Sequence, residues 1–188
     1  HCIYAAENGA TEVTGVDLSE KMIEIAKEKT TYPQVHYLVA AMEDINFPEE
    51  SFDIVLSSLA FHYIKDLNAV FQKIYNCMKK EGVFIFSMEH PIFTAEGSQQ
   101  WLLDNGGNII CWPVDRYFYE GERKAIFLGE EMTKYHRTVT GVIQGLLGAG
   151  FEILNLEEPK PSEEMLKDVE GMMDEMRRPM MLLVKVKK

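Results

Sequence analysis

The sequence has few cysteines, no long apolar run and a shortage of basic residues, and each of these features excludes a class of protein. Its three cysteines, Cys2, Cys77 and Cys111, lie far apart and form no CxxC pair. We therefore predict neither a disulfide framework nor a bound metal, and isolated thiols favour a reducing compartment such as the cytoplasm. No stretch approaches the roughly 18 consecutive apolar residues that a transmembrane helix needs, so a membrane is not an expected partner.

The charge of the chain excludes a second class. Thirty acidic residues against nineteen basic residues give a formal net charge of −11. A protein that holds nucleic acid must neutralise phosphates with Lys and Arg, so this surface repels a polyanion, and nucleic acid is not an expected partner. The 188 residues, of which 46% are hydrophobic, are typical of a globular protein, and we interpret residues 1–188 as a single domain.

Short apolar strands alternate with amphipathic helices through the first ninety residues. The clearest helix opens at Asp66, because apolar residues recur at i, i+3, i+4, i+7, i+8 and i+11 from Leu67 to Met78. Nearly continuous apolar strands between such helices predict a doubly wound, Rossmann-like α/β fold, whose mostly parallel sheet is covered on both faces. We predict strands at residues 13–17, 35–40, 52–57 and 83–88, and helices at about 1–8, 19–29 and 66–81.

Residues 90–135 depart from this alternation. They hold eight of the twenty aromatic residues, among them Trp101 and Trp112, and they show no regular period. Because they are too few for an independent domain, we interpret them as an insertion or lid on the substrate side. After this insertion we predict a helix at 139–147, a strand at 151–156, a helix at 162–176 and a terminal strand at 180–186.

Polar residues gather at the predicted carboxyl ends of the strands, the edge at which open parallel sheets bind ligands. Asp17 closes the first strand, Ser58 and His62 follow the third, and His90 follows the fourth. The Asp17 carboxylate can accept two hydrogen bonds from vicinal ribose hydroxyls. The alternative is that Asp17 only begins the turn into the next helix, and the sequence leaves both roles open.

Taken together, these features resemble the class I S-adenosylmethionine-dependent methyltransferases. The resemblance rests on Val13–Lys27, on Met42–Val55 and on Ser57–Ile64, followed by the helix from Asp66. It implies a seven-stranded type of sheet, methyl transfer from S-adenosylmethionine and release of S-adenosylhomocysteine. The family's first strand and glycine-rich loop would lie before His1, so we expect the domain to be incomplete at this end.

The resemblance also implies which residues contact the methyl donor. Asp17 would bind the ribose hydroxyls, while Leu18 and Met22 would flank the adenine. Along the methionine part of the donor would lie Ser58, Leu59 and His62.

The sequence departs from the family at the adenine amino group. Many relatives bind this group with an Asp after the third strand, where this sequence has Ala41. The backbone around Met42, or Glu43 itself, would have to make the contact here.

Histidines are the candidates for proton transfer. Methyl transfer from a sulfonium disperses charge, so positioning can supply most of the catalysis, and a general base is needed only if the nucleophile must lose a proton. His62 and His90 are candidates for this base, because an unperturbed imidazole titrates near pH 6.5. The alternative for His62 is a packing role, whereas Pro91 would aim His90 at a substrate.

Residues on the insertion and just after it are candidates for the acceptor site. Their aromatic rings can line an apolar chamber, or they can form the small core that keeps the insertion ordered. For His136 and Arg137 the alternative is that they merely open the next helix. The candidates are His90, Trp112, Tyr119, Tyr135, His136 and Arg137, with Trp101 and Tyr117 beside them.

Two rival functions stay open from the sequence. An NAD(P)-dependent oxidoreductase of the Rossmann type would use Asp17 equally well, and a Tyr75-xxx-Lys79 pair of the kind that short-chain enzymes require is present. Tyr75 falls on the apolar stripe of its helix, however, which favours packing. The other rival is a non-catalytic ligand-binding or assembly module with the same fold. We favour a cytoplasmic methyltransferase that acts on a small molecule.

Overall fold

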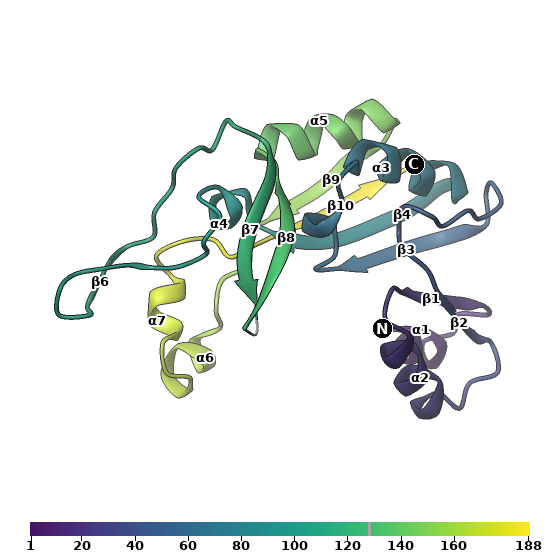
Figure 1. Cartoon of the computed structure of the whole chain (residues 1–188). Coiled ribbons are helices and arrows are strands. Elements are labelled where there is room, and N and C mark those ends of the chain that lie inside the picture. Colours follow the sequence, from purple (N-terminus) through teal and green to yellow (C-terminus); the bar gives the residue numbers. More distant parts are fainter. Residues whose placement is uncertain (128) are drawn as a thin grey trace. The chain divides into compact units, whose positions relative to one another are not determined.

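The structure of the chain is a computed structural model that describes residues 1–127 and 129–188. The chain divides into two compact units, residues 1–47 and residues 48–188. Figure 1 labels the helices and strands of both units.

Unit 1 consists of a parallel strand pair with two helices. The strands pair in register from Val13 opposite Val35 to Asp17 opposite Val39, as the sequence predicts. Gly15 is required in this pair, because a Cβ there would lie 2.7 Å from the ring of Tyr37. The elements of unit 1 are α1 (Cys2–Glu7), β1 (Val13–Asp17), α2 (Glu20–Lys29) and β2 (Val35–Val39).

Unit 2 is built on a four-stranded sheet with the order β3-β4-β10-β9. β3 and β4 are parallel, but β10 runs antiparallel to both β4 and β9, so the expectation of a mostly parallel sheet is corrected to a partly parallel one. The reason is that an apolar strand buried on both faces has the same sequence pattern in either direction. The strands are β3 (Phe52–Ser58), β4 (Met78–Glu89), β9 (Glu152–Glu157) and β10 (Met181–Lys187).

Helices α3 (Leu67–Cys77) and α5 (Val139–Ala149) lie side by side on one face of this sheet (Figure 1). Beneath them, the rings of four phenylalanines pack at centroid distances of 4.9–6.4 Å, mostly edge to face, which is a favourable aromatic geometry. On β3 the apolar side chains of Ile54 and Leu56 are 67% and 49% exposed, so the predicted cover on both faces is incomplete here. The packed rings are those of Phe61, Phe71, Phe84 and Phe86.

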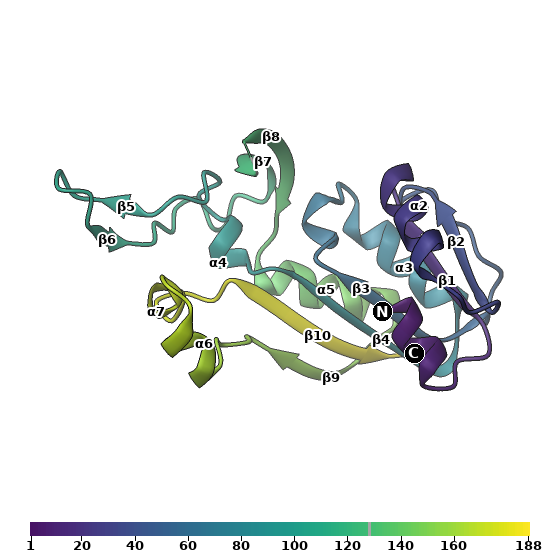
Figure 2. The ribbon, with the colours of Figure 1, turned by 90° about the horizontal axis from the view of Figure 1, so that it is seen from below.

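The insertion at residues 90–135 is more regular than the sequence suggests. It contains two antiparallel strand pairs, β5 with β6 and β7 with β8, and Figure 2 shows both pairs. The alternative that His136 and Arg137 merely open the next helix is wrong, because His136 ends β8 and α5 begins only after its N-cap, Thr138. The elements are α4 (Pro91–Thr94), β5 (Leu102–Leu103), β6 (Ile109–Cys111), β7 (Gly121–Phe127) and β8 (Glu130–His136).

Two further boundaries differ from the prediction. The helix expected at 162–176 is divided into α6 (Glu163–Asp168) and α7 (Met172–Glu175), because Val169 is extended and Gly171 takes a left-handed conformation with φ +83°. Helix α3 ends at Cys77, and Met78 already belongs to β4. No helix in the described part of the chain is long and apolar enough to cross a membrane.

Candidate functional site

The carboxyl end of β3 leads into a tight turn, residues 58–63, which ends in the short 3-10 helix η1 (Phe61–Tyr63). Leu59 holds a left-handed conformation with φ +51°, which is costly for a residue with a branched side chain. Its N–H lies 2.9 Å from the carbonyl oxygen of Ser87 and 3.2 Å from the Ser87 hydroxyl. Ser58 and Leu59 are both exposed, so they are accessible to a ligand at this end of the sheet.

His62 belongs to this turn, and its side chain is buried and neutral. Its Nδ1 accepts a hydrogen bond of 3.3 Å from the backbone N–H of Glu89, so the ring proton lies on Nε2, which is 3.8 Å from Glu89 Oε1. Burial lowers the pKa of His62 to about 4, with Glu89 opposing and Lys134 adding to this effect. The acceptor nitrogen Nδ1 is therefore already hydrogen-bonded, and His62 is poorly placed to accept a proton from a substrate.

His90 is committed in the same way. Its Nδ1 accepts the N–H of Ile92 at 3.0 Å and so caps helix α4, while its Nε2 lies 2.8 Å from Oε1 of Glu158. Burial lowers the pKa of His90, and the carboxylate of Glu158 opposes the shift. His90 thus fixes the direction in which the chain leaves β4.

Lys134, Glu89 and Gln99 form a buried polar network at the end of β4. The sequence analysis did not predict this network. The ammonium of Lys134, whose side chain is 1% exposed, lies 2.6 Å from Glu89 Oε1 and 2.8 Å from Gln99 Oε1. Gln99 in turn donates to Glu89 Oε2 at 2.7 Å. The only sequence signal was Glu89 at a strand end, because nothing near Lys134 indicates that its side chain is buried.

The tryptophans of the insertion form an aromatic cluster with an arginine. Trp112 stacks on Phe93 at 4.9 Å, meets Trp101 edge to face at 5.1 Å, and donates from its indole N–H to the carbonyl of Ile92. The guanidinium of Arg178 lies 4.1 Å from the Trp112 ring, which is a cation–π distance. Beside this cluster lies a cavity of about 280 Å³.

The remaining residues predicted for the acceptor side have diverse environments. Tyr119 is 71% exposed and Tyr135 is half-buried. His136 is fully buried: its Nε2 donates to the carbonyl of Tyr117 at 2.9 Å, and its Nδ1 accepts the hydroxyl of Thr94 at 2.8 Å. Burial lowers the pKa of His136. It is therefore a structural link within the insertion.

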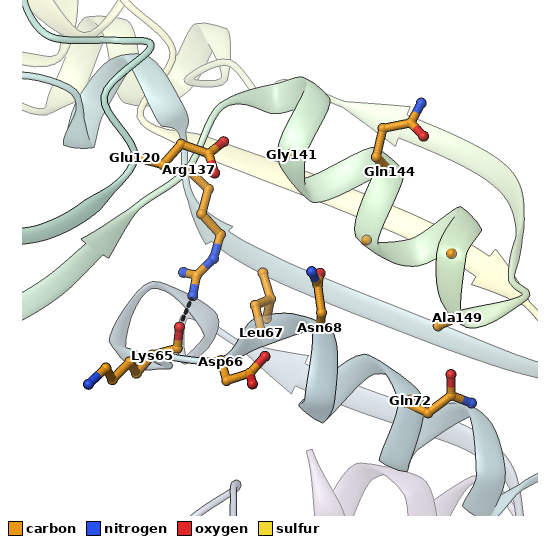
Figure 3. A pocket seen from close by; sticks show the side chains of 12 residues that line it. Lys65, Asp66, Leu67, Asn68, Gln72, Glu120, Arg137, Gly141, Gln144 and Ala149 are labelled. Atoms are coloured by element: carbon orange, nitrogen blue, oxygen red, sulfur yellow. Dashed lines mark hydrogen bonds between the residues drawn. The ribbon is translucent and has the colours of Figure 1, made fainter.

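Arg137 lies beside a larger cavity of about 570 Å³ that α3 and α5 border (Figure 3). Its guanidinium donates to the carbonyls of Ile64 and Lys65, and the bond to Lys65 is 2.9 Å. The wall of this cavity is largely polar, with Asp66 and Gln144 among its side chains. Arg137 therefore connects the helix layer to the chain that follows the turn at residues 58–63.

In unit 1, Asp17 is exposed at the end of β1, and its Oδ1 accepts the N–H of Ser19 at 2.8 Å. Asp17 thus begins the turn into α2, which does not exclude a second role for its other oxygen. The apolar side chains of Leu18 and Met22 are 72% and 55% exposed beside it. An exposed carboxylate next to exposed apolar side chains has the chemistry that a ribose with an attached purine requires.

The remaining predictions concern the adenine amino group, the Tyr75 and Lys79 pair, and metal binding. Met42 is half-buried and Glu43 is exposed in the chain after β2. Lys79 pairs with Asp53 at 2.8 Å, while Tyr75 packs on Phe151, so the Tyr75 and Lys79 side chains have separate partners. Among the described residues, no group of three or more His, Cys, Asp or Glu side chains is arranged to hold a metal ion.

Comparison with known proteins identifies the family. Residues 1–86 match the model of a family described as a methyltransferase domain. A crystal structure of an S-adenosylmethionine-dependent methyltransferase from Mesorhizobium loti is 37% identical with a TM-score of 0.91, and covers all of this chain and 85% of its own. A Listeria monocytogenes structure assigned to the same class is 54% identical with a TM-score of 0.96, and covers all of this chain and 84% of its own.

A curated relative has a similar extent. An uncharacterized protein from Haemophilus influenzae is 31% identical over 201 residues, which span all of this chain and 76% of that protein.

Proposed function

The chain belongs to the class I S-adenosylmethionine-dependent methyltransferases, and from that premise we propose that its methyl acceptor is a small molecule. The observation that carries this proposal is the aromatic cluster of the insertion at residues 90–135, beside which lies a cavity of about 280 Å³ that the insertion and residues 177–179 line together. A cavity of this size fits a small planar or partly apolar group. The net charge of −11 argues against a nucleic-acid acceptor.

S-Adenosylmethionine supplies the activated methyl group, and we propose which residues bind it in each unit. In unit 1, Asp17 accepts hydrogen bonds from the ribose, Leu18 and Met22 flank the adenine, and Met42 or Glu43 contacts the adenine amino group. In unit 2, Ser58 and Leu59 contact the methionine part. The exposure of these residues supports the proposal, with Met42 half-buried.

We propose that catalysis rests on positioning rather than on a histidine base. The ring nitrogens of His62 and His90 accept backbone N–H groups and face carboxylates, and burial lowers the pKa of each. Neither imidazole can take up a proton without losing one of these contacts. In-line displacement at a sulfonium needs alignment of the reacting atoms more than proton transfer, so this arrangement suits the reaction.

On the acceptor side, we propose that Trp112, Tyr119 and Tyr135 contact the substrate. His90, His136 and Arg137 have protein partners for their polar atoms, so in this proposal they shape the wall of the site. The insertion would act as the substrate-side part of one methyltransferase domain over residues 1–188. The three free thiols are compatible with a cytoplasmic location, which stays a proposal.

We also propose that the complete sheet has a further strand beside β3, which would complete a seven-stranded, doubly wound arrangement. β3 lies at the edge of the described sheet of unit 2. Its side chains of Ile54 and Leu56 are exposed, although apolar strand residues are usually covered. An added strand and its following helix would bury them.

Calorimetric titration with S-adenosylhomocysteine and, separately, with NAD tests the function. We expect binding of S-adenosylhomocysteine and none of NAD. Asp17→Ala should weaken binding by about 1–3 kcal/mol, the scale of a lost charge-assisted hydrogen bond. Binding of NAD alone would overturn the proposal, and an unchanged affinity in folded Asp17→Ala would remove the ribose assignment.

A further inference from the structure

The β7–β8 hairpin turns charged and polar side chains inward. Arg123, Lys134 and His136 are 6%, 1% and 0% exposed, while the apolar Ile126 faces outward at 58% exposure. Arg123 donates to the carbonyl of Ala95 at 2.9 Å, and His136 bonds to neighbours in the insertion. The hairpin is therefore fixed by directional hydrogen bonds rather than by apolar packing alone.

The inward side chain of Lys134 contacts Glu89 at the end of β4. Lys134 closes a ring of three hydrogen bonds with Glu89 and Gln99, at 2.6, 2.8 and 2.7 Å. Gln99 has a left-handed backbone with φ +56°, a strained conformation that is sustained only where the surroundings hold it. The ring thus fixes the Glu89 carboxylate in one place.

Glu89 in turn contacts His62, which belongs to the turn at residues 58–63. Its backbone N–H donates to His62 Nδ1, and its Oε1 lies 3.8 Å from His62 Nε2. The imidazole is thereby hydrogen-bonded at Nδ1 and has the Glu89 carboxylate near Nε2, three residues after Leu59 in the chain. A continuous series of contacts runs from β8 through Lys134, Glu89 and His62 to this turn.

Arg137 makes a second connection from the same hairpin. It follows β8, bonds the carbonyl of Tyr135 at 3.2 Å, and donates to the carbonyls of Ile64 and Lys65 just after the turn. Figure 3 shows its guanidinium reaching the Lys65 carbonyl. The turn is therefore held from β8 at His62 and again at the residues that follow it.

We propose that Lys134 and Arg137 are positioning residues that hold residues 58–63 in the shape that binds the methyl donor. The inference rests on the proposed contact of Ser58 and Leu59 with the donor. Leu59 has a strained left-handed backbone three residues before His62, so in this proposal a displaced His62 ring would disturb Leu59 and change donor affinity from outside the donor site. The acceptor-side insertion and the donor site would then be energetically coupled.

The test uses the full chain and S-adenosylhomocysteine as the probe, with calorimetry for affinity and thermal unfolding for stability. Lys134→Met should weaken binding by about tenfold in protein that is still folded. The matched control is Lys124→Met, on the outward side of the same hairpin, where the lysine side chain is 53% exposed. Its affinity should stay within about twofold of the starting protein.

Nuclear magnetic resonance of His62 checks that Lys134 acts on this imidazole in the folded protein, whereas the affinity for S-adenosylhomocysteine decides whether Lys134 positions the turn. Lys134 lowers and Glu89 raises the pKa of His62, so Lys134→Met should raise this pKa above about 4. Lys124→Met should leave it unchanged. A second variant, Arg137→Lys, keeps the positive charge but loses the contact with the carbonyls of Ile64 and Lys65. It should weaken binding of S-adenosylhomocysteine by about threefold, and it serves as the test if Lys134→Met does not fold.

The outcomes separate the two proposals. If the unmodified chain binds no S-adenosylhomocysteine, the assignment of Ser58 and Leu59 fails, and the positioning role falls with it. The other outcome is that the unmodified chain binds S-adenosylhomocysteine, while folded Lys134→Met or Arg137→Lys is less stable but binds it with the same affinity. The two residues are then structural, and only the positioning role is overturned.

Discussion

Three histidines in unit 2 are held in the neutral form by burial. His62, His90 and His136 are each 2% exposed or less, and the pKa of each lies below the ordinary value. A neutral imidazole serves as both donor and acceptor, so each ring joins two chain segments. The sequence indicated histidines at these places, but it could not distinguish a base from a structural link.

This neutrality predicts how stability depends on pH. The unfolded chain protonates His62 near pH 6.5 and the folded chain near 4, so the unfolded state binds more protons between these values. The contribution of His62 to the free energy of unfolding is therefore fully present above about pH 6.5. It is lost as the pH is lowered toward 4, which reduces this free energy by about 3 kcal/mol.

Urea unfolding at pH 7.5 and pH 5 measures this effect. His62→Gln removes the titrating group, so its stability should fall less between the two pH values. The control is His36→Gln, at an exposed position on β2, which should keep the full pH dependence. Equal pH dependence in all three proteins would contradict the buried, neutral state of His62.

At the scale of elements, local signals explain most helices, whereas the β7–β8 hairpin lacks them. Ser19, Asp66, Thr138 and Ser162 each accept an N–H three residues ahead, which begins a helix. The hairpin inverts the usual alternation, because its buried face carries Arg123 and Lys134. A binary pattern of apolar and polar residues therefore cannot reveal it.

The end of α5 gives a prediction for one element. Gly150 has φ +106°, and a Cβ there would lie 2.9 Å from the Tyr75 ring. Gly150→Ala should therefore reduce stability by about 1–3 kcal/mol. The control is Gly148→Ala in the same helix, where a Cβ meets nothing within 4 Å, and which should stabilise by about 0.5–1 kcal/mol.

Thermal unfolding of the two glycine variants is the measurement. A Gly150→Ala protein as stable as the unmodified chain would show that the left-handed cap and the Tyr75 contact do not constrain α5.

On the scale of the whole molecule, the two units differ greatly in the core they contain. In unit 1 the buried apolar residues are Ala6, Ile23 and Val35. Unit 2 buries the four packed phenylalanine rings beneath α3 and α5 and the inner faces of β4 and β10. A unit of 47 residues with so small a core does not offset its conformational entropy. The units should therefore differ in independent stability.

Separate production of the two units tests this difference. Residues 48–188 should unfold in one cooperative transition monitored by circular dichroism, because they contain the four-stranded sheet and its helices. Residues 1–47 should give the spectrum of a largely unfolded chain. A cooperative transition in residues 1–47 would contradict this expectation.

The sequence by itself indicated the methyltransferase family, the strands of both parallel pairs and the residues Ser19, Asp66 and Ser162 at which three of the helices open. These features depend on residues that are close together in the chain, so their patterns are visible without a fold. The position of Asp17 was predicted for the same reason, since it closes a strand and precedes a capped helix, whereas its contact with the donor stays a prediction.

Only the tertiary structure decided the direction of β10, the hairpin at residues 121–136 and the network around Glu89. Lys134 and Glu89 are 45 residues apart, and neither carries a local sign of the other. The free energy of a buried charge depends on which partner the fold brings beside it, so the roles of Lys134 and of the neutral histidines could emerge only once the chain was folded.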